Sequence, residues 1–265
     1  MSNDSEAPNA VIRVEFHCHT AVSHDAVTTE SELVAACIAR DINVVTITEH
    51  DVFVARAFAE LNAAQVNVVH GCEFTCAKGS HIIGLFLERH LDLSGHTPAT
   101  IVKGIREVGG IVYVPHPFKP GTGYFKHYEP SQLLDQVDMM ELYNGGFTLD
   151  PNIGEIRALA AEHDIRLVAG SDSHAAGQVG YYVSEYDSST INDLKHIFRT
   201  QDARLLIDVS RTKPPRELNW IQRHEGYQWL IQRIPRGVKR PLKTMYSRSL
   251  GALGTPSSVI YREIA

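Results

Sequence analysis

Apolar residues in the first 210 positions gather in short runs rich in Val and Ile, and segments with a helical spacing of apolar positions separate most of them. Runs of this length and composition are typical of buried strands. Seven strands are predicted, at residues 11–16, 43–48, 66–69, 82–87, 111–114, 139–143 and 166–169. A later run, residues 204–209, predicts an eighth strand or an edge strand.

Several of the intervening segments begin with residues that favour a helix start. Thr29 opens a capping-box pattern with the glutamate three residues later, and Thr97 precedes a proline at the first helical position. Two more helices are predicted over residues 150–163 and 188–199. Strands that alternate with helices predict an α/β fold with a mainly parallel sheet. Seven strands suit a barrel better than a short open sheet, but the pattern alone does not separate the two.

The composition is that of an ordinary globular protein. Of the 265 residues, 43% are hydrophobic and 21% are charged, which excludes wholesale disorder and collagen-like structure. No apolar run approaches the roughly 18 residues that a membrane-spanning helix needs. The first six residues lack the basic-then-apolar order of a secretory signal. Four cysteines in a chain of this length do not make a disulfide framework, so a cytoplasmic location is expected.

Charge divides the chain into two regions. Residues 211–249 hold ten Lys or Arg against two Glu, so residues 1–210 carry a net charge of −14 within a total of −6. We therefore predict two domains, a body over residues 1–210 and a basic C-terminal extension over residues 211–265, with Pro214-Pro215 near the boundary. The extension could bind an anionic substrate, nucleic acid or acidic lipid. Docking on the acidic body or on a second subunit of a homo-oligomer is favoured slightly over these.

The chain is unusual in its fourteen histidines. Histidine is the commonest metal ligand among side chains. In parallel β/α folds the carboxyl ends of the strands meet at one edge, where active sites form. Six separate elements present His, Asp or Glu at the predicted rim: His17 and His19 with Asp25; Glu49, His50 and Asp51; Glu73; His81; His116; Asp172 and His174.

In order along residues 12–186, the chain reads HCHT, SHDA, TITEHD, GCEF, SHIIGLFL, VPHPF, ELYN and GSDSH. This set resembles the polymerase and histidinol phosphatase (PHP) family. The resemblance implies a distorted (β/α)7 barrel of the TIM-like kind that holds up to three metal ions, and hydrolysis of phosphate esters. Some members of that family are stand-alone phosphatases, some act on nucleic acid, and some are proofreading parts of DNA polymerases.

Carried over position by position, the resemblance implies nine metal ligands, and all nine residues are present. The first metal would be held by His17, His19, Glu73 and Asp172. Glu73 would bridge to a second metal, also held by His81 and His116. A third metal would be held by Asp25, His50 and His174. The residues assigned to catalysis are Glu73, Asp172 and His174.

One position in this set has a competitor. His24 stands beside Asp25 and could take its role, because family members differ in the spacing after His-x-His. Asp25 is favoured, since Ser23-x-Asp25 fits the longer of the two spacings.

The ligand types indicate the metals and the chemistry. Six imidazoles, three carboxylates and no thiolate suit Zn²⁺, Mn²⁺ or Fe²⁺, and structural zinc sites are usually richer in cysteine. Metal pairs roughly 3.5–4 Å apart clamp the attacking and leaving oxygens of a displacement at phosphorus. A metal lowers the pKa of bound water to about 7, so metal-bound hydroxide at a di- or trinuclear centre is the expected nucleophile.

Four further residues are candidates for substrate contact. Lys119 occupies a place where many relatives carry a basic residue near the phosphate, and His24 lies beside the predicted ligands. Tyr143 and Asn144 follow the sixth predicted strand and could line the pocket, although packing is an equal alternative for the tyrosine. Glu141 on the same strand is expected to support the ligands or the fold.

Together these features predict a metal-dependent phosphoesterase, foremost a phosphatase that acts on a small phosphorylated metabolite or nucleotide. A nuclease of the same family is the first alternative, with the basic extension as its contact with nucleic acid. An amidohydrolase is disfavoured because such barrels commonly use a lysine on the fourth strand, which this chain lacks there. A non-catalytic accessory module is disfavoured because such modules usually lose ligands.

Overall fold

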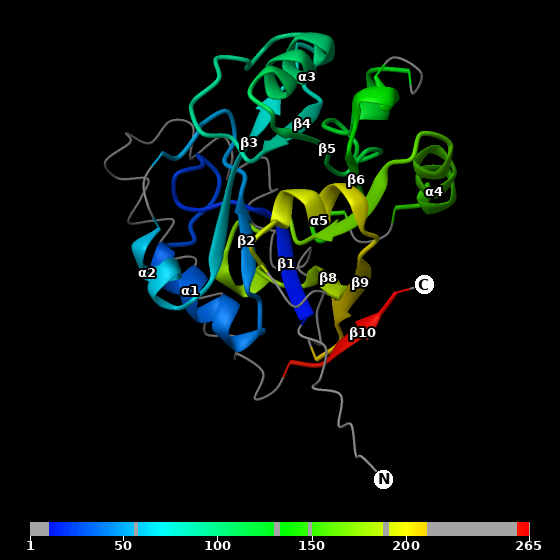
Figure 1. Ribbon diagram of the computed structural model, residues 1–265. Coiled ribbons are helices and arrows are strands. Elements are labelled where there is room, and N and C mark those ends of the chain that lie inside the picture. Colours follow the sequence, from blue (N-terminus) through cyan, green and yellow to red (C-terminus); the bar gives the residue numbers. More distant parts are fainter. Residues whose placement is uncertain are drawn as a thin grey trace, which may run out of the picture.

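The computed structural model describes residues 11–55, 58–129, 133–147, 150–187, 191–210 and 259–264 (Figure 1). The strands are β1 Val11–Cys18, β2 Val44–Ile47, β3 Asn67–Thr75, β4 His81–Leu85, β5 Ile111–Val114, β6 Met139–Asn144, β7 Arg166–Gly170, β8 Tyr182–Asp187, β9 Arg204–Asp208 and β10 Tyr261–Glu263. The α-helices are α1 Glu30–Ala39, α2 Ala59–Ala63, α3 Pro98–Glu107, α4 Ile153–Glu162 and α5 Leu194–Thr200. All described strands belong to one sheet in the order β10-β9-β8-β1-β2-β3-β4-β5-β6-β7.

The sheet curls, so that β7, at one end of the strand order, comes close to β1. The first half of β1 pairs antiparallel with β8. The carboxyl end of β1 instead bridges the segment after β7, where the amide of His19 donates to the carbonyl of Ser173 at 2.9 Å and the amide of Ser173 donates to the carbonyl of His17 at 3.2 Å. A bulge in β1 after Glu15 accompanies this change of partner. β7 is therefore the neighbour of β1 at the end of the sheet where the predicted ligands lie.

An apolar cluster fills the concave face and closes the far end of the curl. It takes residues from each strand from β1 to β8 and from α5. Phe16 of β1 packs edge-on against Phe198 of α5, with ring centroids 4.7 Å apart. Figure 1 shows α5 lying across the sheet near β1, whereas α1 and α2 lie side by side next to β2. The interior is thus apolar towards the amino ends of the parallel strands and polar towards their carboxyl ends.

The predicted helix starts at Thr29 and Thr97 are confirmed, whereas the helix predicted from residue 150 begins at Ile153. The Thr29 hydroxyl accepts from the amide of Glu32, whose carboxylate accepts from the Thr29 amide at 2.9 Å, so the capping box before α1 is complete. Thr97 caps α3, and Pro98 is its first residue. The start of the helix predicted at Ser188 lies outside the described residues, and α5 begins at Leu194.

The expected regular alternation of strand and helix is not what the structure has. β3–β4 and β4–β5 are antiparallel pairs, while β1–β2, β2–β3, β5–β6 and β6–β7 are parallel. Only residues 76–80 separate β3 from β4, and a parallel crossover needs about a dozen residues. β8 was also missed, because Tyr182–Asp187 mixes aromatic and charged residues and does not form an apolar run.

The two-domain division stays a prediction. The basic cluster of residues 211–249 and the Pro214-Pro215 boundary lie outside the described residues. Residues 261–263, at the end of the predicted extension, form β10 and pair antiparallel with β9. The Tyr261 hydroxyl donates to the carbonyl of Gly180 at 3.1 Å. The described end of the chain therefore belongs to the same sheet as the body.

Candidate metal centre

The structure gathers the nine predicted ligands from seven parts of the chain. They come from the end of β1, the loops after β1, β2, β5 and β7, the interior of β3, and the first residue of β4. β4 presents its amino end here because it runs antiparallel to β3. This reversal places His81 next to Glu73, where a parallel strand would have left it at the other end of the sheet.

Glu73 is the central residue of the cluster, and both of its carboxylate oxygens face imidazole nitrogens. Oε1 lies 2.7 Å from Nδ1 of His81 and 3.2 Å from Nε2 of His116. Oε2 faces three rings, at 3.1 to 3.4 Å: His50 Nδ1, His19 Nε2 and His17 Nε2. A fully buried carboxylate surrounded by five imidazoles is the arrangement expected of a ligand shared by neighbouring cations.

Two further carboxylates complete the cluster. Oδ1 of Asp172 lies 3.6 Å from Nδ1 of His174 and 3.7 Å from Nε2 of both His17 and His19. Oδ2 of Asp25 lies 3.4 Å from Nε2 of His50 and 3.2 Å from Nε2 of His174. Asp25 thus lies between His50 and His174, the two histidines predicted to share the third metal with it.

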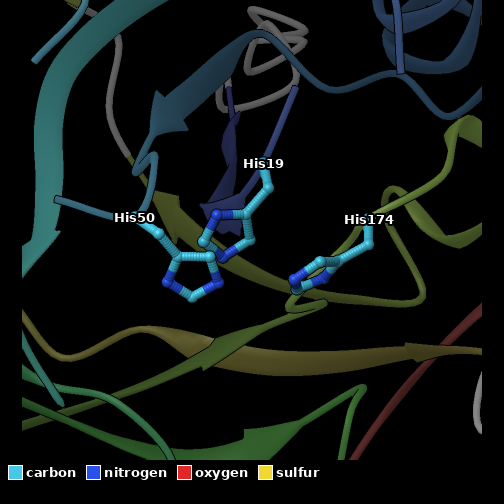
Figure 2. Close-up of side chains that lie close together, drawn as sticks. All are labelled: His19, His50 and His174. Atoms are coloured by element: carbon cyan, nitrogen blue, oxygen red, sulfur yellow. The ribbon is translucent and has the colours of Figure 1, made fainter. Parts of the chain in front are cut away.

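Three histidine rings converge from three separate loops. Figure 2 shows His19, His50 and His174 with ring nitrogens turned toward a common space. The ring centroid of His19 lies 4.4 Å from that of His50 and 4.4 Å from that of His174. Three overlapping triads have ligand atoms within 4.8 Å of one another: His19, His50 and His174; His17, His19 and Glu73; His50, Glu73 and His81.

Unsatisfied polar atoms show that the donor set fits divalent cations. Within the described part of the chain, buried atoms Nε2 of His19, Nδ1 of His116 and Oδ1 of Asp25 have no hydrogen-bond partner. A buried polar atom without a partner costs about 1–3 kcal/mol. Imidazole lone pairs and carboxylate oxygens are the ligands that Zn²⁺, Mn²⁺ and Fe²⁺ accept, so a bound cation would satisfy Nε2 of His19 and Oδ1 of Asp25. His116 differs, because its Nε2 and not its Nδ1 faces Glu73, at 3.2 Å.

The electrostatics of the cluster differ between its members. Burial lowers the pKa of His17, His50 and His174, but the carboxylates around these rings outweigh it and raise the pKa, so a bound metal would displace a proton from them. Burial raises the pKa of Glu73, but His81, His17 and His50 outweigh it and hold the pKa well below its usual value. Burial lowers the pKa of His19, and the neighbouring His174 and His50 lower it further. The central carboxylate is therefore ionised, and the most enclosed ring of the three in Figure 2 is neutral with a lone pair available.

The backbone at the centre adopts an uncommon conformation. His116 has φ +30° and Asp172 has φ +49°, in the left-handed region that residues other than glycine rarely occupy. Strained conformations of this kind cluster at functional sites, where the surrounding structure enforces them. Two of the nine predicted ligands are thus held in positions that the chain would not adopt by itself.

Glu49 fixes the loop between His19 and Asp25, a role that the sequence analysis missed. Its carboxylate accepts from the amides of Thr20 and Ser23, each at 3.0 Å, and from both of their hydroxyl groups. The Ser23 hydroxyl oxygen also accepts from the amide of His50 at 3.1 Å. The only available signal was an acidic residue directly before His50, which also occurs at ordinary strand ends.

The four predicted substrate contacts have different surroundings. The Lys119 amine lies 2.6 Å from Oδ2 of Asp172, next to the cluster. His24 is 81% exposed in its side chain, and its ring centroid lies 5.5 Å from that of His50. Tyr143 is buried and stacks on Tyr182, while Asn144 is buried and donates to Glu141 at 2.7 Å. Lys119 and His24 are therefore at the cluster, whereas Tyr143 and Asn144 have contacts within the core.

A curled α/β sheet with imidazoles and carboxylates gathered at one end is the layout of a metal-binding hydrolase. The chain belongs to the PHP domain family, whose model matches residues 15–246. This confirms the family inferred from the motifs. The family includes metal-dependent phosphoesterases, which implies divalent metals, in agreement with the His and Glu clusters of the structure.

Individual relatives are more distant. An uncharacterized protein of Methanocaldococcus jannaschii, MJ1587, is 29% identical over 123 residues, which is 41% of this chain and 70% of that protein. The fold is similar to that of PsfC from Pseudomonas syringae, with TM-score 0.60, 15% identity and coverage of 91% of this chain and 99% of PsfC.

Two larger proteins share part of the fold. A two-domain protein of Bacteroides vulgatus that contains a predicted PHP-like metal-dependent phosphoesterase has TM-score 0.59 and 15% identity over 74% of this chain and 64% of that one. The lesion-specific endonuclease Q of Pyrococcus furiosus has TM-score 0.57 and 16% identity over 74% of this chain and 58% of that one. The chain thus spans less than two thirds of either protein. Among the residues described here, no helix is long and apolar enough to cross a membrane.

Proposed function

We propose that this protein hydrolyses a phosphate ester in a metal-dependent reaction, as a phosphatase of a small phosphorylated metabolite or nucleotide. The observation that carries the proposal is Glu73, a buried carboxylate in contact with five imidazoles. A structural ion pair needs only one partner, whereas a bridging ligand between cations requires such a surplus of nitrogen atoms around it. Membership of the PHP family supports the same reading.

The proposed ligand groups follow the observed distances. His17, His19, Glu73 and Asp172 would hold one metal; Glu73, His81 and His116 a second; and Asp25, His50 and His174 a third. When bound, divalent metals such as Mn²⁺, Zn²⁺ or Fe²⁺ supply positive charge that stabilises the transition state and lower the pKa of water.

Lys119 would bind the phosphate next to this centre. Burial lowers its pKa, but the contact with Asp172 outweighs this and keeps the pKa above its usual value, so the amine is charged. A charged amine that is already oriented toward the cluster can move from Asp172 to a phosphate oxygen without a change in the fold. His24, exposed at the rim, would contact the part of the substrate that extends outward.

A phosphate-release panel tests the proposal. Chelator-treated protein, reconstituted separately with Mn²⁺, Zn²⁺ or Fe²⁺, would be assayed on sugar phosphates, mononucleotides and short oligonucleotides. We expect release of phosphate from at least one small monoester, and none after chelation. Oligonucleotide cleavage far faster than any monoester hydrolysis would replace the phosphatase with the nuclease, and inactivity with every metal and substrate would contradict both.

A further inference from the structure

Behind the metal centre, on β6, a second buried carboxylate accepts hydrogen bonds but lies outside the predicted ligand set. Glu141 is 1% exposed. Its Oε1 accepts from the Tyr113 hydroxyl at 2.8 Å and lies 3.3 Å from Nδ1 of His17. Its Oε2 accepts from the backbone amide of His116 at 2.7 Å and from Nδ2 of Asn144 at 2.7 Å. One side chain therefore contacts two predicted metal ligands that come from different strands.

The fold leaves space for this carboxylate at one glycine. A Cβ atom at Gly170 would lie 2.5 Å from Oε1 of Glu141 and 2.8 Å from Cβ of His17. Both distances are too short for any side chain, so the contact between Glu141 and His17 depends on glycine at the end of β7. The contact is consequently built into the backbone of three neighbouring strands.

His17 is held between two carboxylates, one at each ring nitrogen. Nε2 faces the centre, 3.4 Å from Oε2 of Glu73, and Nδ1 faces Glu141. An ionised carboxylate only accepts hydrogen bonds, so Nδ1 of His17 carries the proton that it donates to Glu141. Nε2 is then the nitrogen available to a metal, and when a metal is bound there its lone pair is directed at the centre.

His116 is held by Glu141 through its backbone. Its amide donates to Oε2 of Glu141 while the residue has φ +30°, and its Nε2 lies 3.2 Å from Oε1 of Glu73. A backbone amide cannot reverse its role from donor to acceptor. Oε2 of Glu141 must therefore remain an acceptor in any variant that keeps this strand in place.

We propose that Glu141 is a positioning residue that sets the tautomer of His17 and the orientation of His116, and thereby the metal affinity of the site they share with Glu73. This rests on the proposed function, in which His17 and His116 are ligands. His174 is held differently, because its Nδ1 lies 2.9 Å from the backbone carbonyl oxygen of Asp172.

The substitution Glu141→Gln separates this role from mere packing, because it preserves shape. The glutamine oxygen must stay with the obligate donor, the amide of His116, so the NH₂ group faces Nδ1 of His17 and the Tyr113 hydroxyl. Nδ1 of His17 then has to accept, which moves the proton to Nε2 and removes the lone pair directed at the centre. Tyr113→Phe is the matched control, because Oε1 loses one donor but stays a carboxylate oxygen.

Two measurements test the proposal. Long-range ¹H–¹⁵N NMR spectra of zinc-loaded, histidine-labelled protein report which ring nitrogen carries a proton, with His17 assigned by comparison with His17→Gln. We expect His17 protonated on Nδ1 in the wild type and in Tyr113→Phe, and this Nδ1 proton to be absent in Glu141→Gln. Zinc titration of the same proteins in metal-free form should show affinity reduced by about 10–100-fold in Glu141→Gln alone, the usual loss for a partner behind a ligand.

The outcomes that would overturn the proposal are distinct. A zinc-loaded wild-type protein with His17 protonated on Nε2 overturns it whether or not the variant folds. Glu141→Gln that keeps Nδ1–H and wild-type zinc affinity overturns it while leaving the proposed function intact. A wild-type protein that binds no zinc, manganese or iron overturns the proposed function and this inference together.

Discussion

The two ends of β1 carry polar clusters of opposite character. At the amino end, Nε of Arg13 lies 2.7 Å from Glu185 and its Nη1 lies 2.5 Å from Asp41. Arg204 adds contacts of 2.8 Å to Glu185 and 2.7 Å to Asp187. Each of these contacts joins a cation to an anion, so this network is complete as it stands.

The carboxyl end of β1 leads into the histidine cluster, where imidazoles outnumber carboxylates. The ring centroid of His19 lies 4.4 Å from those of His50 and His174, and among the described residues the buried atoms Nε2 of His19 and Oδ1 of Asp25 lack hydrogen-bond partners. Such atoms weaken a fold unless something binds them. The comparison teaches that the arginine network serves stability, whereas the histidine cluster is arranged for cations.

The largest effect is expected from the bridging carboxylate. Glu73→Gln should lower turnover by more than about a hundredfold, since even residues behind a ligand cost 10–100-fold. It should also reduce bound metal measured by elemental analysis. Glu185→Gln, at the other end of β1, is the control and should keep the metal content of the wild type. A fully loaded and active Glu73→Gln protein would break the distinction between the two ends.

The next largest effect on metal binding is expected at Asp25, which is adjacent to His24 in the loop after β1. Asp25→Asn should weaken metal binding by roughly 10–100-fold, because Asp25 lies between His50 and His174, and a neutral amide is a poorer ligand. His24→Ala should leave metal content unchanged, since its side chain is exposed. Metal titration of both variants shows which of the two residues is the metal ligand. The reverse pattern, with His24→Ala losing metal, would show that the ligand in this loop is assigned to the wrong residue.

Substrate contact should depend on one lysine of the loop after β5. Lys119→Met is expected to lower kcat/KM by roughly 10–100-fold, the loss of one charge-assisted hydrogen bond to phosphate. Lys126→Met is the matched control, because that exposed amine lies 5.6 Å from the ring centroid of Phe118 and not against a predicted ligand. Steady-state kinetics with the best monoester of the panel provide the comparison. Equal effects in both variants would contradict a specific role for Lys119.

The smallest effect on chemistry is expected at the arginine network. Arg13→Ala removes one partner of Glu185, which keeps Arg204, while Asp41 stays exposed to water, so the free energy of unfolding should fall by about 1 kcal/mol. Metal affinity and turnover should stay at the wild-type level. Urea unfolding of metal-free protein, with zinc titration alongside, measures both. Loss of metal binding without loss of stability would show that the two clusters are coupled through β1.

Several features were readable from the sequence because they depend on local chemistry. The capping box of α1 and the proline start of α3 need only neighbouring residues, and both were predicted. The core of β1, β2, β5, β6 and β7 coincides with apolar runs, since buried parallel strands are apolar on both faces. Histidines and carboxylates placed after these strands pointed to the rim for the same reason.

Other features depend on partners that are distant in sequence. β8 mixes tyrosines with charged residues, and it becomes a strand because it pairs with the first half of β1 and with β9. The antiparallel direction of β4 follows from a short turn, and it alone brings His81 to Glu73.

The candidate metal ligands could thus be named before the structure was seen, from the histidines and carboxylates placed after the strands and from the resemblance of the motifs to a family. How these side chains are held depends on contacts made in the folded chain. Glu141 supports His17 across 124 positions of sequence, and Gly170 leaves the space for that contact. Glu141 was expected to support the ligands or the fold, but its partners, and the role of the strand-end glycine, arise only when β1, β6 and β7 are brought together by folding.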